Sequence, residues 1–250
     1  MSKIDRRQLL TGAATLAGGI ILAGATDAGR SARAAQMPRI YTREEWGALP
    51  PDTTATIIGP PDHLVVHHTA SENTTDYSLD QAFALSQWIQ DLHVGNGWGD
   101  SGQQLTISRG GYIMEGRNRT LEALDLGMNV YGVQTANHNS HTLGIENEGI
   151  YVDADPTQQL WDSLVTTLAW LCELYGLDPH EAIVGHRDYV ATQCPGDVFY
   201  GRLPELRNDV ADSLGLLARE RTTPTVRSGL PKPSAPFDHG PALGARERRP

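Results

Sequence analysis

Residues 182–196 read AIVGHRDYVATQCPG, a predicted strand followed by a loop with two candidate metal ligands, and the rest of the chain is interpreted around this stretch. The short apolar run 182–184 predicts a buried strand, and a polar loop follows it. The loop carries His186 and Cys194, eight residues apart, which is enough chain to fold back and bring both side chains to one ion. Imidazole and thiolate together suit zinc. Because two ligands cannot close a zinc site, a third ligand must come from elsewhere in the chain.

The stretch His63–Thr69, HLVVHHT, offers that third ligand. Its β-branched centre predicts a buried strand that places His67 at the C-terminal end. A histidine satisfied within the core is the alternative for His67. The next residue, His68, faces the opposite way in a strand, and we expect it to support the site or to be structural. The predicted metal ligands are therefore His67, His186 and Cys194, holding Zn²⁺.

The rest of the chain alternates predicted strands and helices. A capping box at Ser78 opens a helix that runs to about residue 93, and residues 105–109 and 112–115 form a hairpin around two glycines. Alternation in strand 142–149 places Glu146 and Glu148 on one face. A helix capped by Asp155 ends before Gly176, and a last helix carries Leu206, Val210, Leu214 and Leu217. We predict an α/β fold with a single domain, in which a central mixed β-sheet is flanked by helices.

The two ends of the chain differ in charge from its middle. Residues 1–35 carry a net charge of +3 and residues 219–250 carry +4, which leaves −17 for residues 36–218. Such an acidic domain argues against nucleic-acid binding. Residues 219–250 are rich in Arg, Pro and Gly without periodicity, so we predict a disordered tail that follows a folded domain at 36–218. Cys172 lies in a helical apolar pattern and is interpreted as a core residue, with a disulfide to Cys194 as the alternative.

Residues 1–35 are interpreted as an export signal. Arg6 and Arg7 precede a Gly/Ala-rich apolar stretch, and Ala32–Ala34 supplies an A-x-A cleavage site. Paired arginines favour the twin-arginine route and a secreted or cell-wall-associated protein, without stable membrane insertion once the signal is removed. Export by the Sec route and an uncleaved membrane anchor are the alternatives.

Seven short motifs in order resemble the peptidoglycan recognition protein and type-2 amidase family. The motifs read WGA at 46–48, VHHT at 66–69, GWGD at 97–100, RGG at 109–111, EGR at 115–117, LGIE at 143–146, and GHR with CPG at 185–187 and 194–196. The resemblance covers about residues 38–216. The resemblance implies a zinc-dependent N-acetylmuramoyl-L-alanine amidase. Such an enzyme cuts the amide between the lactyl group of muramic acid and L-alanine in peptidoglycan or a muropeptide. The family's zinc ligands fall on the three residues predicted above.

One position departs from the family pattern. Gln103 stands where many recognition amidases have a tyrosine, and glutamine donates hydrogen bonds but does not titrate. The resemblance to a second bacterial branch implies that Glu146 is the general base instead; a buried partner of Arg117 or another cation is the alternative. It also implies that Thr192 stabilises the oxyanion, unless its hydroxyl only bonds its own loop.

Substrate contacts are expected from His68, Gln103 and Arg117, the last through forked pairing with a stem-peptide carboxylate. His93 matches a family histidine without a metal role, and His239 is expected to be solvated. A non-catalytic peptidoglycan-binding module is the rival function. Gln103 favours that rival, whereas the presence of Cys194 favours an enzyme.

Overall fold

The computed structural model describes residues 36–220, 224–225 and 228–247. The predicted export signal at residues 1–35 lies outside these ranges. Within them, none of the helices has both the length and the apolar character needed to cross a membrane.

A six-stranded mixed sheet forms the centre of the domain. Its order is β1 (Ile40–Tyr41), β5 (Ile113–Glu115), β4 (Leu105–Ile107), β7 (Thr142–Asn147), β3 (His63–His68) and β8 (Ile183–Gly185). β4 and β5 are antiparallel, and every other neighbouring pair is parallel. The central strands β3 and β7 are buried along nearly their whole length, as parallel strands covered on both faces are.

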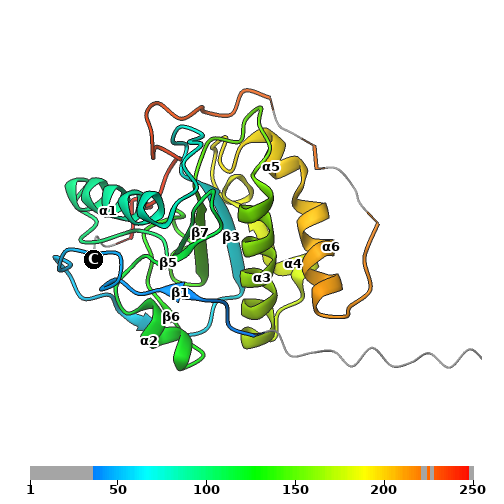
Figure 1. Cartoon of the computed structure of the whole chain (residues 1–250), viewed down its shortest axis with the longest axis horizontal. Coiled ribbons are helices and arrows are strands. Elements are labelled where there is room, and N and C mark those ends of the chain that lie inside the picture. The colour runs from blue at the N-terminus through cyan, green and yellow to red at the C-terminus, as the bar shows by residue number, and fades with distance from the viewer. Residues whose placement is uncertain (1–35, 221–223, 226–227, 248–250) are drawn as a thin grey trace, which may run out of the picture. The chain divides into compact units, whose positions relative to one another are not determined.

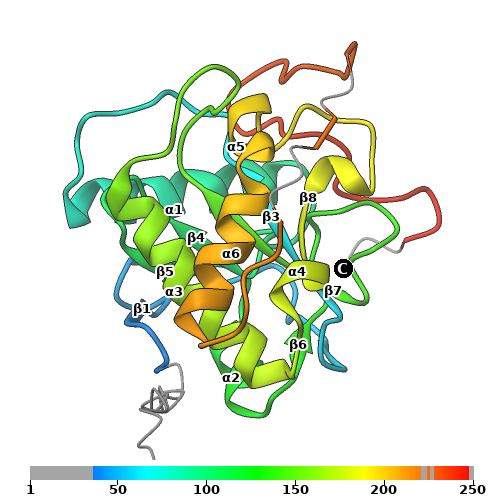
Figure 2. The ribbon, with the colours of Figure 1, turned by 90° about the vertical axis from the view of Figure 1, so that its right-hand side faces the viewer.

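Helices cover both faces of this sheet (Figure 1). The main core packs α3 (Gln158–Tyr175) and α6 (Leu203–Ser213) against one face through Leu164, Leu168 and Leu206. Figure 2 looks onto this face. On the other face, α1 (Leu79–Gly95) buries Ala82 against Met114 of β5. The predicted fold class, a single α/β domain with a mixed sheet flanked by helices, is confirmed.

Short elements complete the described chain. They are β2 (Ile57–Ile58) paired with β6 (Asn129–Val130), α2 (Thr120–Asp125), α4 (Pro179–Ala182), the 3₁₀ turn η1 (His186–Asp188) and α5 (Asp197–Gly201). Cys172 is a free thiol buried in the main core, so its interpretation as a core residue is confirmed.

Helix ends differ in detail from the predictions. Ser78 caps α1 by accepting from the N–H of Gln81, but the Gln81 side chain bonds Glu148 rather than closing a capping box. The cap of α3 is Thr157 and not Asp155, whose carboxylate pairs with an arginine of the α5–α6 junction instead. The last helix ends at Ser213, so Leu217 lies outside it and is 90% exposed.

The C-terminal region differs from the expectation of a disordered tail. Residues 228–247 contain no helix or strand, yet Phe237, His239 and Ala242 are buried against the domain. This segment returns beside α1, as the red end of the chain shows in Figure 1. The packing has no sequence period because an extended segment is held by individual contacts rather than by one repeating face.

Candidate metal centre

The predicted ligands meet at the carboxyl edge of the parallel strands. His67 is the penultimate residue of β3 and lies in register with Glu146 of β7. β8 runs parallel to β3 on its other side and leads directly into His186. Since parallel strands end at one edge of a sheet, residues far apart in the sequence come together there.

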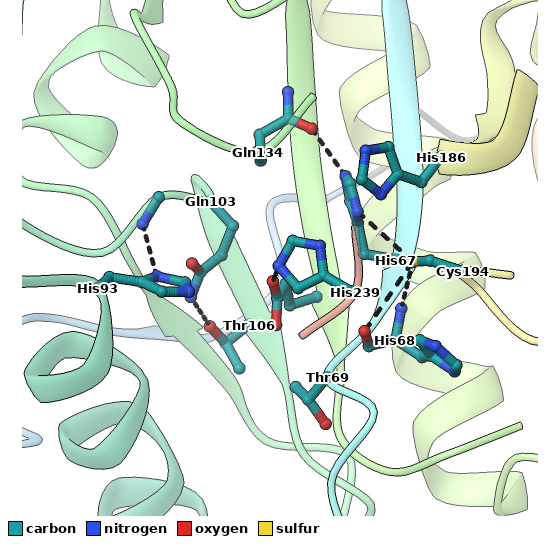
Figure 3. Close-up of polar contacts among 12 residues, drawn as sticks. His67, His68, Thr69, His93, Gln103, Thr106, Gln134, His186, Cys194 and His239 are labelled. Carbon is teal, nitrogen blue, oxygen red and sulfur yellow. Dashed lines mark hydrogen bonds and ion pairs between the residues drawn. The ribbon is translucent and has the colours of Figure 1, made fainter. Parts of the chain in front are cut away.

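One ligand atom from each of four buried residues lies within 4.8 Å of the others: His67, His186, Cys194 and His239 (Figure 3). The His67 Nδ1 to Cys194 Sγ distance is 3.7 Å. Tetrahedral zinc with ordinary bond lengths would hold such a pair about 3.6 Å apart. The structure thus brings the three predicted ligands together and adds a fourth residue.

Hydrogen bonds orient both predicted imidazoles toward this point. His67 Nε2 lies 2.7 Å from Gln134 Oε1, and the amide nitrogen of Gln134 donates to Thr142 Oγ1 at 2.7 Å. The amide oxygen therefore faces His67, whose Nε2–H donates to it, leaving the Nδ1 lone pair free. His186 Nε2 likewise donates to the Pro241 carbonyl at 3.2 Å.

The free ring nitrogens support a metal site. His186 Nδ1 is buried and has no hydrogen-bond partner among the described residues. Metal-binding histidines characteristically donate their other ring N–H to a carbonyl or carboxylate in this way. The donor set and its orientation therefore fit Zn²⁺.

Burial keeps both imidazoles neutral. Desolvation, followed by the neighbouring His186 and His239 rings, lowers the pKa of His67 well below its usual value. Desolvation, followed by His239, does the same for the pKa of His186. Neutral imidazole is the form that binds a metal.

The Cys194 thiol needs a metal to ionise. Its burial raises the pKa well above the usual value, although the His68 N–H, 3.4 Å from the sulfur, favours the thiolate. Metal binding must therefore release the thiol proton, and metal affinity increases with pH.

Glu146 and Thr192 both border the metal centre. The Glu146 carboxylate is fully buried and its Oε1 lies 2.7 Å from His239 Nε2. The two atoms are close without the alignment of a hydrogen bond, and the polar neighbour of the Glu146 carboxylate is His239 rather than Arg117. The Thr192 hydroxyl accepts from the Cys194 N–H at 3.1 Å and donates to the His239 carbonyl at 2.7 Å.

His239 is the residue that sequence reasoning missed. We expected it to be solvated, but its side chain is 2% exposed and its ring lies 5.2 Å from that of His67. It sits in a segment without periodicity, so no pattern signalled its position. A histidine followed by Gly and Pro in a region otherwise suited to disorder was the one available hint.

His93 also lies closer to the site than expected. Its Nδ1 accepts from the Gly102 N–H at 3.0 Å, and its ring lies 6.4 Å from that of His239. One atom each of His93, Glu146 and His239 lies within 4.8 Å of the others. Gln103 projects into the same region, donates to Thr106 Oγ1 at 2.9 Å and has no described partner for its Oε1 (Figure 3).

His68 and Arg117, the other two residues expected to contact substrate, have surroundings that differ from those of Gln103. His68 points away from the metal centre, its Nδ1 accepts from the Tyr151 N–H at 3.3 Å, and burial lowers its pKa to about 3. This position favours the structural alternative. Arg117 is fully buried and donates to the Ser101 carbonyl at 3.0 Å, while its Nε and Nη2 have no hydrogen-bond partner in the described part of the chain. Burial lowers the pKa of Arg117 to about 10.

We compared the sequence with models of known protein families. A family model described as N-acetylmuramoyl-L-alanine amidase, Amidase_2, matches residues 58–197, the span from β2 to the start of α5. The chain belongs to this family. The Amidase_2 match includes all three predicted metal ligands and ends before His239. The suspected resemblance is therefore confirmed at the level of the family.

Similar proteins include both amidases and recognition proteins. The chain is 33% identical over 172 residues to the human N-acetylmuramoyl-L-alanine amidase, covering 66% of this chain and 28% of that protein. It is 26% identical over 201 residues to the Drosophila melanogaster peptidoglycan-recognition protein LB, covering 79% and 82%. A mutant of the latter, solved in complex with tracheal cytotoxin, matches with a TM-score of 0.56 and 27% identity over 64% of this chain and 89% of that one. The chain spans less than a third of the human relative.

Proposed function

We propose that the chain is a zinc-dependent N-acetylmuramoyl-L-alanine amidase, which hydrolyses the amide between the lactyl group of muramic acid and L-alanine in peptidoglycan. One observation carries this proposal: His67, His186 and Cys194 converge beside a buried carboxylate and a hydroxyl. A group of this kind can polarise an amide, move a proton and stabilise an oxyanion.

His67, His186 and Cys194 would hold the zinc in this enzyme. When bound, zinc supplies Lewis acidity toward the scissile carbonyl and lowers the pKa of water at an open coordination position. Gln134 orients His67 for this task, and the His68 N–H stabilises the thiolate of Cys194. In our proposal, His68 therefore stabilises the thiolate of Cys194 and does not contact substrate.

Glu146 acts as the general base and then as the general acid. Its carboxylate lies in register with His67 and is buried, so it is close to the ligands and shielded from solvent. We propose that it takes a proton from the attacking water and returns it to the leaving alanine nitrogen. Thr192 Oγ1, two residues before Cys194, donates to the oxygen that develops negative charge.

Gln103 and Arg117 are proposed to contact the substrate. Gln103 is buried and bonds Thr106, the register partner of Glu146, and its amide oxygen has no partner among the described residues. Within the same residues, two guanidinium nitrogens of Arg117 are also unpaired. A stem-peptide carboxylate would satisfy the latter pair in a forked geometry. Tracheal cytotoxin, a monomeric diaminopimelic acid-type peptidoglycan, is the ligand of the solved relative and supports a muropeptide as the substrate class.

A non-catalytic peptidoglycan-binding module is the alternative function. Gln103 favours it, because glutamine cannot titrate in place of tyrosine. The retained Cys194 ligand and the buried Glu146 favour the enzyme. We also propose that the protein acts outside the cytoplasm, secreted or bound to the cell wall, since its substrate lies there and residues 1–35 have the pattern of a signal.

Product analysis distinguishes these functions. The full-length protein, loaded with one equivalent of zinc, is incubated with a defined muropeptide, and the products are identified by mass spectrometry. We expect a free stem peptide that begins with L-alanine, together with an intact sugar that keeps its lactyl group. A chelator should abolish the reaction and added zinc should restore it. Binding of the muropeptide without any cleavage after prolonged incubation, both by this protein and by its variant His239→Ala, would favour the recognition module.

A further inference from the structure

The segment 231–247, here called the C-terminal strap, crosses the metal centre. Its backbone bonds the domain on both sides of the site: the Phe237 N–H donates to the Thr69 carbonyl at 2.8 Å, and the Pro241 carbonyl accepts from the Ala136 N–H at 3.1 Å. His239 lies between these two points. The strap is therefore held before and after the residue that enters the site.

Phe237 anchors the strap on α1. Its ring is buried against Leu85 and Ile89 and meets the Trp88 ring edge to face, with the centroids 4.7 Å apart. Trp88 itself is 56% exposed, so the strap covers part of an otherwise open apolar surface. Burying an aromatic side chain contributes much of the free energy that such a segment needs to stay docked.

Two further contacts fit the strap closely to the domain. Gly240 has a φ of +113°, and a Cβ at this position would lie 2.6 Å from Thr192 Oγ1, so only glycine allows the approach. The Glu247 carboxylate accepts from the Asn137 N–H at 2.7 Å and from Asn139 Nδ2 at 3.1 Å. The Gly240 contact thus lies on the loop after β8, and the Glu247 contacts fix the strap on the loop that precedes β7.

His239 contacts each of the three groups that the proposed reaction requires: the metal ligands, Glu146 and Thr192. Its ring joins the ligand atoms of the metal centre, its Nε2 contacts Glu146, and its carbonyl accepts from the Thr192 hydroxyl. The buried Nδ1 has no hydrogen-bond partner among the residues described. In Figure 3 the His239 ring faces His67 and His186.

We infer that His239 is a fourth protein ligand of the metal centre, and that the C-terminal strap thereby holds the full-length chain in a closed, latent form. The inference rests on the proposed zinc site. With four protein ligands the site has the closed composition of a structural zinc centre, whereas catalytic centres keep a position open. The substrate amide can reach the metal, Glu146 and Thr192 only after the strap has left.

Glu146 has a second role in the closed form. A carboxylate that contacts one ring nitrogen of a histidine commonly directs the other nitrogen to a metal. The contact between Glu146 and His239 Nε2 leaves Nδ1 for the metal in this manner. The proposed general base is thus occupied in positioning the ligand that blocks the reaction.

The decisive test measures metal coordination rather than enzymatic activity. Full-length protein and the variant His239→Ala are loaded with Co²⁺ in place of zinc, and visible absorption is recorded while azide is added. We expect the wild-type spectrum to be insensitive to azide and the variant spectrum to change, because an open position admits the anion. Zinc affinity, measured by competition with a chelating dye, should fall at least about tenfold in the variant. Identical azide responses in the two proteins would overturn the inference.

Two further full-length variants separate ligation from docking. Phe237→Asp keeps His239 but removes the apolar anchor, so it should reproduce the azide response of His239→Ala. Lys232→Ala changes an exposed strap residue and should behave as the wild type. If Phe237→Asp also behaved as the wild type, the strap would not be what holds the site closed, and the latent form would be excluded.

Activity distinguishes this inference from the proposed function. Under zinc-replete conditions we expect kcat/KM toward a muropeptide to rise at least about tenfold in His239→Ala, because the open form of the wild type must be minor if the strap is docked. An altered azide response and zinc affinity without cleavage by any variant would support the inference and contradict the amidase. Equal cleavage with equal metal properties would support the amidase and contradict the inference.

Discussion

At the residue scale, this site depends on which ring nitrogen each histidine leaves free. Gln134 accepts from Nε2 of His67 and the Pro241 carbonyl accepts from Nε2 of His186, so both rings leave Nδ1 free for the proposed metal. His239 follows the same rule, with Glu146 at its Nε2. The His67 and His186 rings are thus oriented by carbonyl oxygens, whereas the His239 ring lies against the carboxylate of the proposed base.

The role of Glu146 can be separated from its contact with His239. In the His239→Ala background, Glu146→Gln should lower kcat at least about a hundredfold, because a positioned acid–base group typically contributes this much. Bound zinc should stay at one equivalent, whereas Cys194→Ser should lose zinc. Muropeptide turnover and metal content are measured on the same preparations. Turnover close to that of the parent would show that Glu146 is not the proton carrier.

At the element scale, buried polar contacts tie α1 to the loop before β4 and to the end of β5. The Asp100 carboxylate is fully buried and accepts from Arg43 Nη2 at 3.0 Å, Gln90 Nε2 at 2.9 Å and the Asn118 N–H at 2.7 Å. Leu85 and Ile89 of α1 also pack against Phe237, so this carboxylate supports the helix on which the strap docks.

Loss of this carboxylate should destabilise the domain strongly. Asp100→Ala leaves Arg43, which is 13% exposed, without its buried partner, and removing one member of a buried ion pair typically costs about 3–5 kcal/mol. The free energy of unfolding is measured by urea titration. Asp91→Ala, at an exposed position of the same helix, should change it by less than about 0.5 kcal/mol. Similar effects of the two substitutions would mean that the buried contacts contribute little.

At the scale of the whole molecule, one ion would link β3, the loop after β8 and the C-terminal strap. His67 and Cys194 are 127 residues apart in the sequence, and the strap residue His239 follows Cys194 by a further 45, so the metal would connect these segments only in the folded state. Metal binding and folding are coupled when the unfolded chain cannot assemble the ligands.

Zinc should therefore raise the melting temperature of the full-length protein. A free zinc concentration one hundred times the dissociation constant adds about 2.7 kcal/mol to stability, which corresponds to a Tm increase of at least about 5 °C for a domain of this size. Differential scanning calorimetry before and after chelation measures the shift. The shift at equal zinc concentration should be smaller for His239→Ala, because one ligand is missing. An unchanged Tm after chelation would contradict a metal that joins these segments.

The sequence alone determined the fold class and the two central strands, and it selected three residues, His67, His186 and Cys194, that the structure brings together. These features depend on local signals: β-branched runs for β3, helical periodicity for α3, imidazoles at the ends of strands and a thiol in the loop after β8. The sequence pattern did not fix the exact ends of the helices. The cap of α3, for example, is Thr157 rather than Asp155. Only the tertiary structure placed His239, because its burial depends on Thr69, Thr192 and Ala136, which hold the strap one bond at a time and leave no period in the sequence.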